Sequence, residues 1–305
     1  MIDLSIVILN WNVCDLLDRC LASLRSDRYA LEIIVVDNAS RDDSVTMVRA
    51  KYPQVTVIAN AENRGFAGGN NQGIAAARGR YVMVLNPDTE VLDDAPDRLI
   101  VYLEEQADVG AIGPQLLNPD RSVQSSRRRF PTLTTAFFES TWLQSLAPRG
   151  ILTQYYMDDV QSDHPHEVDW LNGACTVFRR EVFDRVGVYD VENFFMYSEE
   201  LDLCRRVKQA GWKIVYVPEA QVIHYVGQSS DQAVAARHIY FQTSKVHYFR
   251  KWHGAFQATC LRLFLLSQYA WQIGLESVKG VLGNKREMRR QRVRVYWQVI
   301  RTGLK

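Results

Sequence analysis

The sequence has few cysteines and no apolar run long enough to cross a bilayer. Its 305 residues include five scattered cysteines, an odd number, with no CxxC pair. Disulfide frameworks and cysteine-based zinc sites need regular pairs, so we expect reduced, mostly buried thiols in a cytoplasmic protein. Near the C-terminus the longest apolar stretch without a charge, Leu263 to Leu275, has 13 residues, whereas a membrane span needs about 20. The start of the chain lacks the basic residues of a secretory signal.

The common glycine-rich nucleotide motifs are also absent. The segment NRGFAGGNNQG (Asn63–Gly73) contains four glycines, but it has neither the GxGxxG spacing of a Rossmann site nor the Gly-Lys-Ser/Thr of a P-loop. A flexible turn would explain the glycines. It would not explain Arg64 beside Asn70 and Asn71, and a cation among small residues favours a diphosphate site.

Charge is unevenly distributed along the chain. Residues 1–230 carry 22 Lys and Arg against 32 Asp and Glu, a net charge of −10, whereas residues 231–305 carry 14 against 3, a net charge of +11. We therefore predict an α/β domain at residues 1–230 and a helical, basic region at residues 231–305 that needs an anionic partner.

Apolar runs alternate with amphipathic segments over the first 115 residues. The runs LSIVILN, LEIIVVD, VTVIAN and RYVMVL are predicted strands, with helices between them. This order predicts a largely parallel sheet covered on both faces, which binds ligands beyond the carboxyl ends of its strands. Three of the four strands end in polar residues, at Asn10, Asp37 and Asn86.

The rest of the first domain is less regular. We expect loops and short helices over residues 116–169, within the same domain. Strands are then predicted at Ala174–Arg179, Lys213–Val217 and Gln221–Tyr225, and helices at Glu181–Val186 and from Ser198 onward.

Acidic residues mark two places. Asp88 and Glu90 follow the fourth strand, and such oxygens suit Mg²⁺ or Mn²⁺ on phosphates, although acidic turns are common. His224 ends another strand and is either structural or a neighbour of Asp88. Glu199 and Glu200 open the helix after Ser198, together with Asp202, and these acids either complement the helix dipole or surround a cation or substrate.

The segment DWLNGAC contains an indole beside a glycine turn. Trp170 and Asn172 precede Gly173 and a buried strand. The indole is either a flat platform for a sugar ring or nucleobase, or a packed part of the core, and the residues alone leave both open.

Seven motifs occur in an order that is typical of one family. They are SIVILNWN, VVDNAS, NRGFAGGNNQGI, VLNPDTEV, WLNGAC, FFMYSEELDLCRR and VIHYVGQS. Over about residues 3–230 the sequence resembles family 2 glycosyltransferases of the GT-A fold, in particular the bacterial rhamnosyltransferase-like branch. The resemblance implies a Rossmann-like, mostly parallel sheet and transfer of a sugar from a nucleoside diphosphate.

The resemblance also implies residue roles. Asn10 and Asp37 would contact the base and ribose of the donor, and the rest of the nucleotide pocket would comprise Asn63, Arg64, Gly65, Asn70 and Asn86. NPD stands where the family has DxD, so Asn86 replaces the first acid. Asp88 is then the implied ligand of Mg²⁺ or Mn²⁺, with Glu90 and His224 as further ligands.

The implied reaction is an inverting, metal-dependent transfer. Glu200 stands where relatives carry the general base, with Glu199 as the alternative, while Trp170, Asn172 and Gly173 would form the acceptor or sugar platform. The favoured donor is dTDP-rhamnose, and the acceptor is a saccharide, free or linked to polyprenyl diphosphate, in cell-surface polysaccharide assembly. The alternatives are a same-fold enzyme that uses UDP-galactofuranose or UDP-N-acetylglucosamine, and an inactive nucleotide-sugar-binding protein.

The C-terminal region combines an apolar helix, FQATCLRLFLLSQYAWQIGL, with the basic segment NKREMRRQRVRVYW. Basic clusters beside Trp and Tyr favour an anionic membrane surface, which predicts a peripheral protein on the inner face of the cell membrane. Nucleic-acid binding is disfavoured because no RNA-binding motif is present. A subunit interface in a homo-oligomer is the other possibility.

Overall fold

The computed structural model describes residues 1–139, 141–148, 150–227, 230–283 and 285–305, and it divides into two compact units. Unit 1 comprises Met1–Phe130, Gln154–Phe195 and Glu199–Ser229, and unit 2 comprises Pro131–Thr153, Met196–Ser198 and Ser230–Lys305. Unit 2 therefore contains part of the middle section as well as the basic region. Gln228 and Ser229 of the VIHYVGQS motif, and Asn284 of the basic segment, lie outside the described residues.

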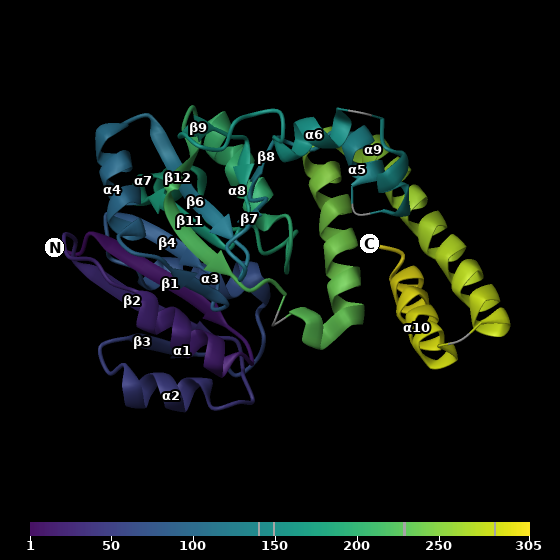
Figure 1. Ribbon diagram of the computed structural model, residues 1–305, viewed down its shortest axis with the longest axis horizontal. Helices are drawn as coiled ribbons and strands as arrows, with labels where there is room; N and C mark the ends of the chain where they lie inside the picture. The colour runs from purple at the N-terminus through teal and green to yellow at the C-terminus, as the bar shows by residue number, and fades with distance from the viewer. Residues whose placement is uncertain (140, 149, 228–229, 284) are drawn as a thin grey trace. The chain divides into compact units, whose positions relative to one another are not determined.

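Unit 1 is built on a mixed sheet that has ten strands among the described residues (Figure 1). The order is β3-β2-β1-β4-β11-β6-β12-β5, with β7 beside β6 and β9 beside β12. The first four of these strands are parallel, as are β6 and β12, whereas β11 runs antiparallel between β4 and β6. The predicted α/β fold is confirmed. The strands of the sheet are β1 (Leu4–Asn10), β2 (Leu31–Asp37), β3 (Thr56–Ala59), β4 (Tyr81–Leu85), β5 (Thr89–Val91), β6 (Val109–Leu117), β7 (Val123–Gln124), β9 (His166–Glu167), β11 (Cys175–Arg179) and β12 (Lys213–His224), and β8 (Arg127–Arg128) pairs separately with β10 (Trp170–Leu171).

Helices cover both faces of this sheet. One apolar cluster joins the sheet to α1, α2 and α4, and a second joins it to α3, α7 and α8. Side chains of a strand alternate between faces, so Ile6 and Ile8 of β1 lie in the first cluster and Val7 in the second. Full burial of each such side chain contributes about 1.5–3 kcal/mol. These helices are α1 (Cys14–Ser23), α2 (Ser44–Lys51), α3 (Gly65–Ala76), α4 (Ala95–Glu105), α7 (Arg180–Val186) and α8 (Glu199–Gln209), and unit 1 also contains residues of α6 (Ile151–Tyr156).

The glycine-rich segment is largely helical, in contrast to the flexible turn that its composition allows. Helix α3 begins at Gly65 and packs closely on β1. A Cβ atom at Gly69 would lie 2.2 Å from Cδ1 of Leu9, and one at Gly73 would lie 2.2 Å from Cγ1 of Val7. The glycines are therefore required by the short distance between helix and strand.

Two predicted strands, Lys213–Val217 and Gln221–Tyr225, form the single strand β12. Its register against β6 shifts between Val217 and Gln221. Pro218 lies in this irregularity, where its missing N–H breaks no regular ladder bond. The bulge lets the strand continue to His224.

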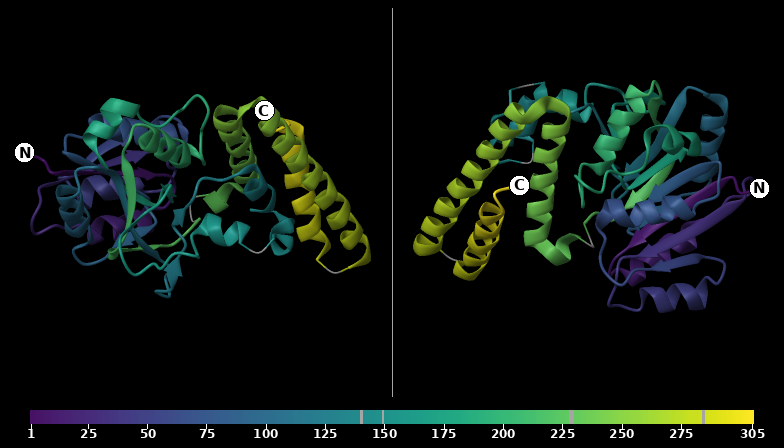
Figure 2. Two further views of the ribbon diagram at one scale, coloured as in Figure 1. Left: turned by 90° about the horizontal axis from the view of Figure 1, so that it is seen from above. Right: turned by 180° about the vertical axis from the view of Figure 1, so that it is seen from behind.

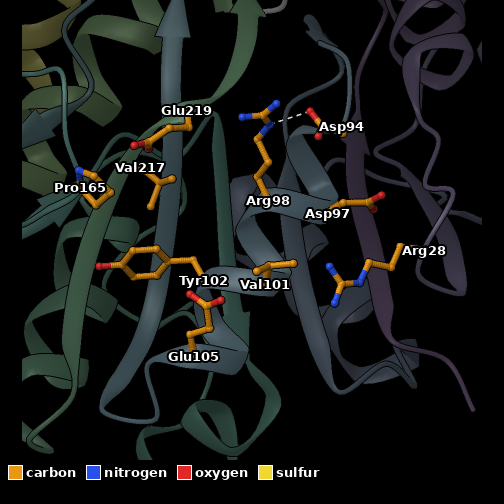
Figure 3. Close-up of a pocket in the computed structure, with 10 residues that line it drawn as sticks. All are labelled: Arg28, Asp94, Asp97, Arg98, Val101, Tyr102, Glu105, Pro165, Val217 and Glu219. Carbon is orange, nitrogen blue, oxygen red and sulfur yellow. Dashed lines mark hydrogen bonds and ion pairs between the residues drawn. The ribbon is translucent and has the colours of Figure 1, made fainter.

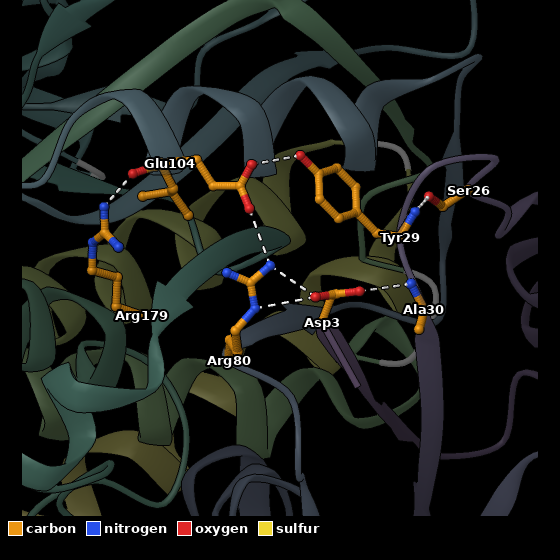
Figure 4. A network of polar contacts seen from close by, with 8 residues as sticks. Asp3, Ser26, Tyr29, Ala30, Arg80, Glu104 and Arg179 are labelled. Atoms are coloured by element: carbon orange, nitrogen blue, oxygen red, sulfur yellow. Dashed lines mark hydrogen bonds and ion pairs between the residues drawn. The ribbon is translucent and has the colours of Figure 1, made fainter. Parts of the chain in front are cut away.

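A network of hydrogen bonds and ion pairs lies at the amino-terminal edge of the sheet and joins the strand starts there to α4 (Figure 4). Nη2 of Arg80 donates to Oδ1 of Asp3 at 2.8 Å and to Oε1 of Glu104 at 3.0 Å. Asp3 Oδ2 accepts from the backbone N–H of Ala30, and the Tyr29 hydroxyl donates to Glu104. These contacts connect the start of β1, β2 and β4 to α4, and they leave the carboxyl edge for ligands.

Unit 2 is helical. Its main helix, α9 (Val234–Leu282), bends at Gly254, which has φ 86°, and α10 (Arg286–Thr302) packs along it (Figure 2). His238 on the first half of α9 bonds the Tyr269 hydroxyl on the second half at 3.0 Å, and both rings contact Tyr296 of α10. In the part of the chain that the structure describes, no helix is both long and apolar enough to cross a membrane. The shorter helices are α5 (Leu133–Phe138), η1 (Trp142–Leu146) and η2 (Ser230–Ala233).

Candidate active site

Asn10 and Asp37 lie side by side at the carboxyl ends of β1 and β2. The parallel register pairs them directly, and Nδ2 of Asn10 donates to Oδ2 of Asp37 at 2.9 Å. Both side chains are buried, and Asn10 Oδ1 has no hydrogen-bond partner among the described residues. A buried acceptor without a donor is costly, so this oxygen is a natural contact for a ligand.

Asn38 connects this strand end to the glycine-rich segment. Its Nδ2 donates to Oδ1 of Asn63 at 3.2 Å and to the carbonyl of Gly65 at 2.9 Å. Its Oδ1 accepts from the backbone N–H of Arg64. Asn38 follows Asp37 in VVDNAS and so shares the polar strand end noted in the sequence, although it is not among the predicted site residues.

The start of α3 approaches the loop before α8. Gly65 has φ +74°, and a Cβ atom there would lie 2.3 Å from the carbonyl of Phe195. The same carbonyl accepts from the backbone N–H of Phe66 at 2.8 Å. One turn later Asn70 is buried: its Nδ2 bonds the carbonyl of Phe66, while its Oδ1 has no partner within the described chain. The side chain of Arg64 is exposed.

Asp88 and His224 form a buried pair at the carboxyl ends of β4 and β12. Oδ1 of Asp88 lies 3.4 Å from Nε2 of His224. On the far side of the ring, Nδ1 lies 2.8 Å from Oε1 of Gln124, whose Nε2 donates to Asn118 at 2.9 Å. Since the amide oxygen faces the imidazole, it accepts from Nδ1–H, and Nε2 is the ring nitrogen directed toward Asp88.

Gln124 was not predicted, because it lies on a two-residue strand in the irregular section and belongs to no motif. Glu90, the third predicted ligand, is bonded to a different residue: its Oε1 accepts from the Tyr225 hydroxyl at 2.9 Å. Among the residues that the structure describes, no group of three or more His, Cys, Asp or Glu side chains could hold a metal ion. A carboxylate beside an oriented imidazole is nevertheless a pair of donors of the kind that divalent ions bind.

Glu199 and Glu200 open α8, as predicted. Glu199 is buried, and burial together with the neighbouring carboxyl raises its pKa well above the usual range. Burial also raises the pKa of Glu200, to about 7, although the backbone N–H groups of Glu200 and Leu201 oppose the shift. A carboxyl group with a pKa near neutrality is suited to general base catalysis.

The third acid of this turn is structural. Asp202 is fully buried and pairs with Nε of Arg206 at 2.9 Å. Arg206 also donates to the carbonyls of Val186, the last residue of α7, and of Val188 just after it. These bonds join α8 to the end of α7, and the ion pair with Arg206 occupies the carboxylate of Asp202.

The DWLNGAC segment packs against the core of unit 1 and forms a turn next to Glu200. The indole of Trp170 packs against the second apolar cluster, and its Nε1 donates to the carbonyl of Arg129 at 3.0 Å. The structure therefore favours the core role over the exposed platform. Oδ1 of Asn172 accepts from the backbone N–H of Ala174 at 3.0 Å, which shapes the turn around Gly173.

This turn joins the two halves of the site. The carbonyl of Ala174 accepts from the backbone N–H of Asn86, at the end of β4. A Cβ atom at Gly173 would lie 3.6 Å from Cβ of Glu200 and 3.7 Å from the ring of Phe66. Glu200 of α8 and the segment that leads to Asp88 therefore both neighbour this turn within unit 1.

A separate cavity of about 370 Å³ lies along α4 (Figure 3). None of the predicted site residues lines it, and its walls combine cations such as Arg28 with acids such as Glu105 and Glu219. Arg98 and Asp94 on its rim pair with each other at 2.6 Å. The mixed charges show no selection for a ligand of one sign.

Comparisons with known proteins identify the family to which the chain belongs. Residues 5–187 match the family described as Glycosyl transferase family 2, and residues 131–282 match Glycosyl transferase family group 2. The chain is 32% identical over 232 residues to N-acetylglucosaminyl-diphospho-decaprenol L-rhamnosyltransferase of Mycobacterium tuberculosis, spanning 72% of this chain and 75% of that protein. It is 29% identical over 230 residues to Rhamnosyltransferase WbbL of Escherichia coli, spanning 72% and 82%.

Solved structures share the fold at low identity. Mannosyltransferase PcManGT from Pyrobaculum calidifontis, in complex with GDP-Man and Mn²⁺, aligns with a TM-score of 0.56 at 16% identity, over 99% of this chain and 84% of that one. GalNAc-T7 with UDP, GalNAc and Mn²⁺ aligns with a TM-score of 0.57 at 16% identity, over 82% of this chain and 50% of that one. The chain belongs to glycosyl transferase family 2, and it is a rhamnosyltransferase-like glycosyltransferase with the GT-A fold.

Proposed function

We propose that the enzyme transfers rhamnose from dTDP-rhamnose to a saccharide, free or linked to polyprenyl diphosphate, with inversion at the anomeric carbon, in the assembly of a cell-surface polysaccharide. The likeness to two rhamnosyltransferases supports the choice of sugar. The observation that carries the proposal is that the turn at Gly173 and Ala174 contacts both Glu200 and the segment before Asp88, which in turn lies 3.4 Å from His224.

The nucleotide binds at the ends of β1 and β2. Asn10 and Asp37 contact the base and ribose, and the unpartnered Oδ1 of Asn10 accepts a hydrogen bond from the donor. Asn63, Gly65 and Asn70 line the pocket at the start of α3, while the exposed Arg64 reaches the diphosphate. Asn86 completes the pocket beside Asp88.

Asp88 and His224 would hold a divalent ion, Mg²⁺ or Mn²⁺, and such an ion would supply positive charge beside the departing diphosphate. Asp88 would contribute a hard oxygen and His224 its Nε2, while Gln124 accepts from Nδ1–H and orients the ring. Glu90 is not required, because its carboxylate is held by Tyr225.

Glu200 acts as the general base. Its carboxylate takes the proton from the acceptor hydroxyl while that oxygen forms a bond to the anomeric carbon. The bond from this carbon to the diphosphate breaks, and the diphosphate leaves with the electron pair. Attack from the side opposite the leaving group inverts the configuration.

The donor can be tested directly. We expect dTDP-rhamnose with Mn²⁺ or Mg²⁺ to raise the melting temperature of the enzyme, and the enzyme to transfer rhamnose to a polyprenyl-diphosphate-linked N-acetylglucosamine. A stronger response to UDP-galactofuranose or UDP-N-acetylglucosamine would contradict the choice of sugar and favour the same-fold alternative. Donor binding with no transfer to any acceptor would favour a binding protein.

We further propose that unit 2 docks the enzyme on the inner face of the cell membrane, where lipid-linked acceptors lie. Five exposed side chains of α9 lie at spacings that place them on one helix face, the α9 stripe: Phe256, Leu263, Trp271, Val278 and Leu282. Exposed basic residues of α10, the α10 basic face, comprise Arg286, Arg290, Arg294 and Arg301, beside the exposed Trp297. Each Lys or Arg near an anionic bilayer contributes about 1 kcal/mol.

Vesicle binding tests this docking. The full-length enzyme should co-sediment with vesicles of phosphatidylglycerol and phosphatidylcholine and much less with phosphatidylcholine alone. Leu263→Ser with Trp271→Ser should weaken binding, whereas Val123→Ser with Val191→Ser, at exposed apolar sites of unit 1, should not. Unchanged vesicle binding combined with loss of a dimer in light scattering would contradict docking and identify the α9 stripe as a subunit interface.

A further inference from the structure

The two glutamates at the start of α8 form a carboxyl pair that is withdrawn from water. The side chain of Glu199 is 3% exposed, and the Oε2 atoms of both Glu199 and Glu200 are covered and have no hydrogen-bond partner among the described residues. The two glutamates are neighbours in the chain, and the charge of Glu200 acts on the carboxyl group of Glu199. Two carboxyl groups so placed can hydrogen-bond to each other once one of them carries a proton.

Within the described part of the chain, none of the groups that shift the pKa of Glu199 or Glu200 is a cation that could neutralise a doubly ionised pair. Arg206 forms an ion pair with Asp202, and Lys208 forms ion pairs with Glu167 and Asp169. The other titratable neighbours, Tyr189 and Cys204, stay neutral, because burial raises the pKa of Tyr189 well above its usual range and that of Cys204 to about 12. Two adjacent buried carboxylates without a cation retain one proton between them.

The surroundings decide which carboxyl keeps that proton. The carboxyl of Glu200 accepts from the backbone N–H groups of Glu200 and Leu201, and these orphan donors of the helix start favour an anion. Glu199 is more deeply buried, and the charge of Glu200 disfavours its ionisation further. The proton therefore resides on Glu199, and the negative charge resides on Glu200.

We propose that Glu199 is a positioning residue that remains protonated through the reaction and donates a hydrogen bond that orients the Glu200 carboxylate toward the acceptor hydroxyl. The proposal rests on the assignment of Glu200 as base. During transfer the acceptor O–H bond breaks and its proton moves to Glu200, while Glu199 keeps its own proton. After release of the product, Glu200 returns the acquired proton to water.

A matched pair of substitutions tests this role. Glu199→Gln preserves a donor of the same length, whereas Glu199→Leu removes the donor at similar volume. We expect the glutamine variant to keep kcat within a few-fold of wild type. Without the hydrogen bond the Glu200 carboxylate is less stabilised, so the leucine variant should move the acid limb of the kcat–pH profile up by about one pH unit. The KM for the donor sugar should stay constant in both.

Three outcomes separate this proposal from the assignment of the base. If Glu199→Gln loses as much turnover as Glu200→Gln at every pH, Glu199 is itself the base and the proposal is wrong. If the two Glu199 variants have identical pH profiles, the donated hydrogen bond has no role. Wild-type turnover by Glu200→Gln would instead remove the base assignment on which the proposal rests.

Thermal unfolding provides a readout that needs no activity. A carboxyl group with a raised pKa binds more protons in the folded state than in the unfolded state, so its contribution to stability falls as pH rises above about 4.5. Glu199→Gln removes this group and should reduce the loss of melting temperature between pH 5 and pH 8 relative to wild type. An unchanged or steeper loss would show that Glu199 is ionised in the folded enzyme and would overturn the proposal.

Discussion

Nε2 of His224 lies 3.4 Å from Oδ1 of Asp88, although the two residues end strands that are far apart in the sequence. Strand β5 brings them together, because it follows Asp88 directly and pairs antiparallel with the end of β12, where Thr89 lies opposite His224. Gln124 then fixes the orientation of the imidazole from the other side. The pair therefore depends on three separate segments of chain.

This arrangement predicts that Gln124 affects metal binding without touching the ion. Gln124→Ala should weaken the affinity for Mn²⁺ in the presence of dTDP by about 10–100-fold, since the imidazole loses the acceptor that fixes its tautomer. Glu90→Gln should leave the affinity unchanged, because Glu90 is bonded to Tyr225. Calorimetric titration with Mn²⁺ measures both. A loss in Glu90→Gln equal to that in Gln124→Ala would place Glu90 among the ligands.

Glu200→Gln should abolish transfer while leaving the donor site intact. We expect kcat to fall by about 10²–10⁴-fold, the usual contribution of a general base, with an unchanged Kd for the donor nucleotide. Steady-state kinetics and calorimetry measure the two quantities. Turnover near the wild-type level would show that another group takes the proton.

The activity of the wild-type enzyme should rise with pH. Glu200 acts in its ionised form, and its pKa is raised to about 7 by burial. Turnover should therefore be low at pH 5 and increase through an acid limb near pH 7. Because chemistry must limit kcat for this limb to be visible, single-turnover rates at each pH are the suitable measurement, and a limb near pH 4.5 would indicate a solvated base.

The packing of α3 on β1 predicts opposite effects at two glycines. Gly73→Ala should destabilise the protein by about 1–3 kcal/mol, because the new methyl group would overlap Val7 in a packed interface. Gly274→Ala on α9 meets no atom within 4 Å and should stabilise that helix by about 0.5–1 kcal/mol. Denaturant unfolding measures both values. Equal effects would mean that the close approach of α3 does not account for Gly73.

Much of unit 1 was predictable, because its signals are local. Buried strands such as Leu4–Asn10 are continuous apolar runs, and the polar residues that end them, Asn10 and Asp37, follow from parallel pairing at one edge. The first turn of α8 was visible from three acids after Ser198, although Ser198 has a left-handed φ of 64° and not the extended backbone of a usual N-cap.

The sequence left the structure open or predicted it wrongly where tertiary packing overrides the local conformational preference of the residues. The glycines of NRGFAGG resemble a loop in the sequence, yet they allow α3 to lie against Leu9 and Val7. The strands predicted at Lys213–Val217 and Gln221–Tyr225 are one strand, because a bulge between them carries β12 on to His224. The sequence left Trp170 either as an exposed platform or as part of the core, and in the structure its indole packs against the second apolar cluster.

The sequence by itself determined the order of strands and helices, the chemical types at the strand ends and the charge of the C-terminal region, because these depend on residues that are neighbours in the chain. Only the tertiary structure decided which of these groups meet. The pairing of Asp88 with His224, the support of His224 by Gln124, the diversion of Glu90 to Tyr225 and the burial of Glu199 beside Glu200 all depend on strand register and helix packing. Register and packing are set by the whole apolar core, so no local pattern reports them.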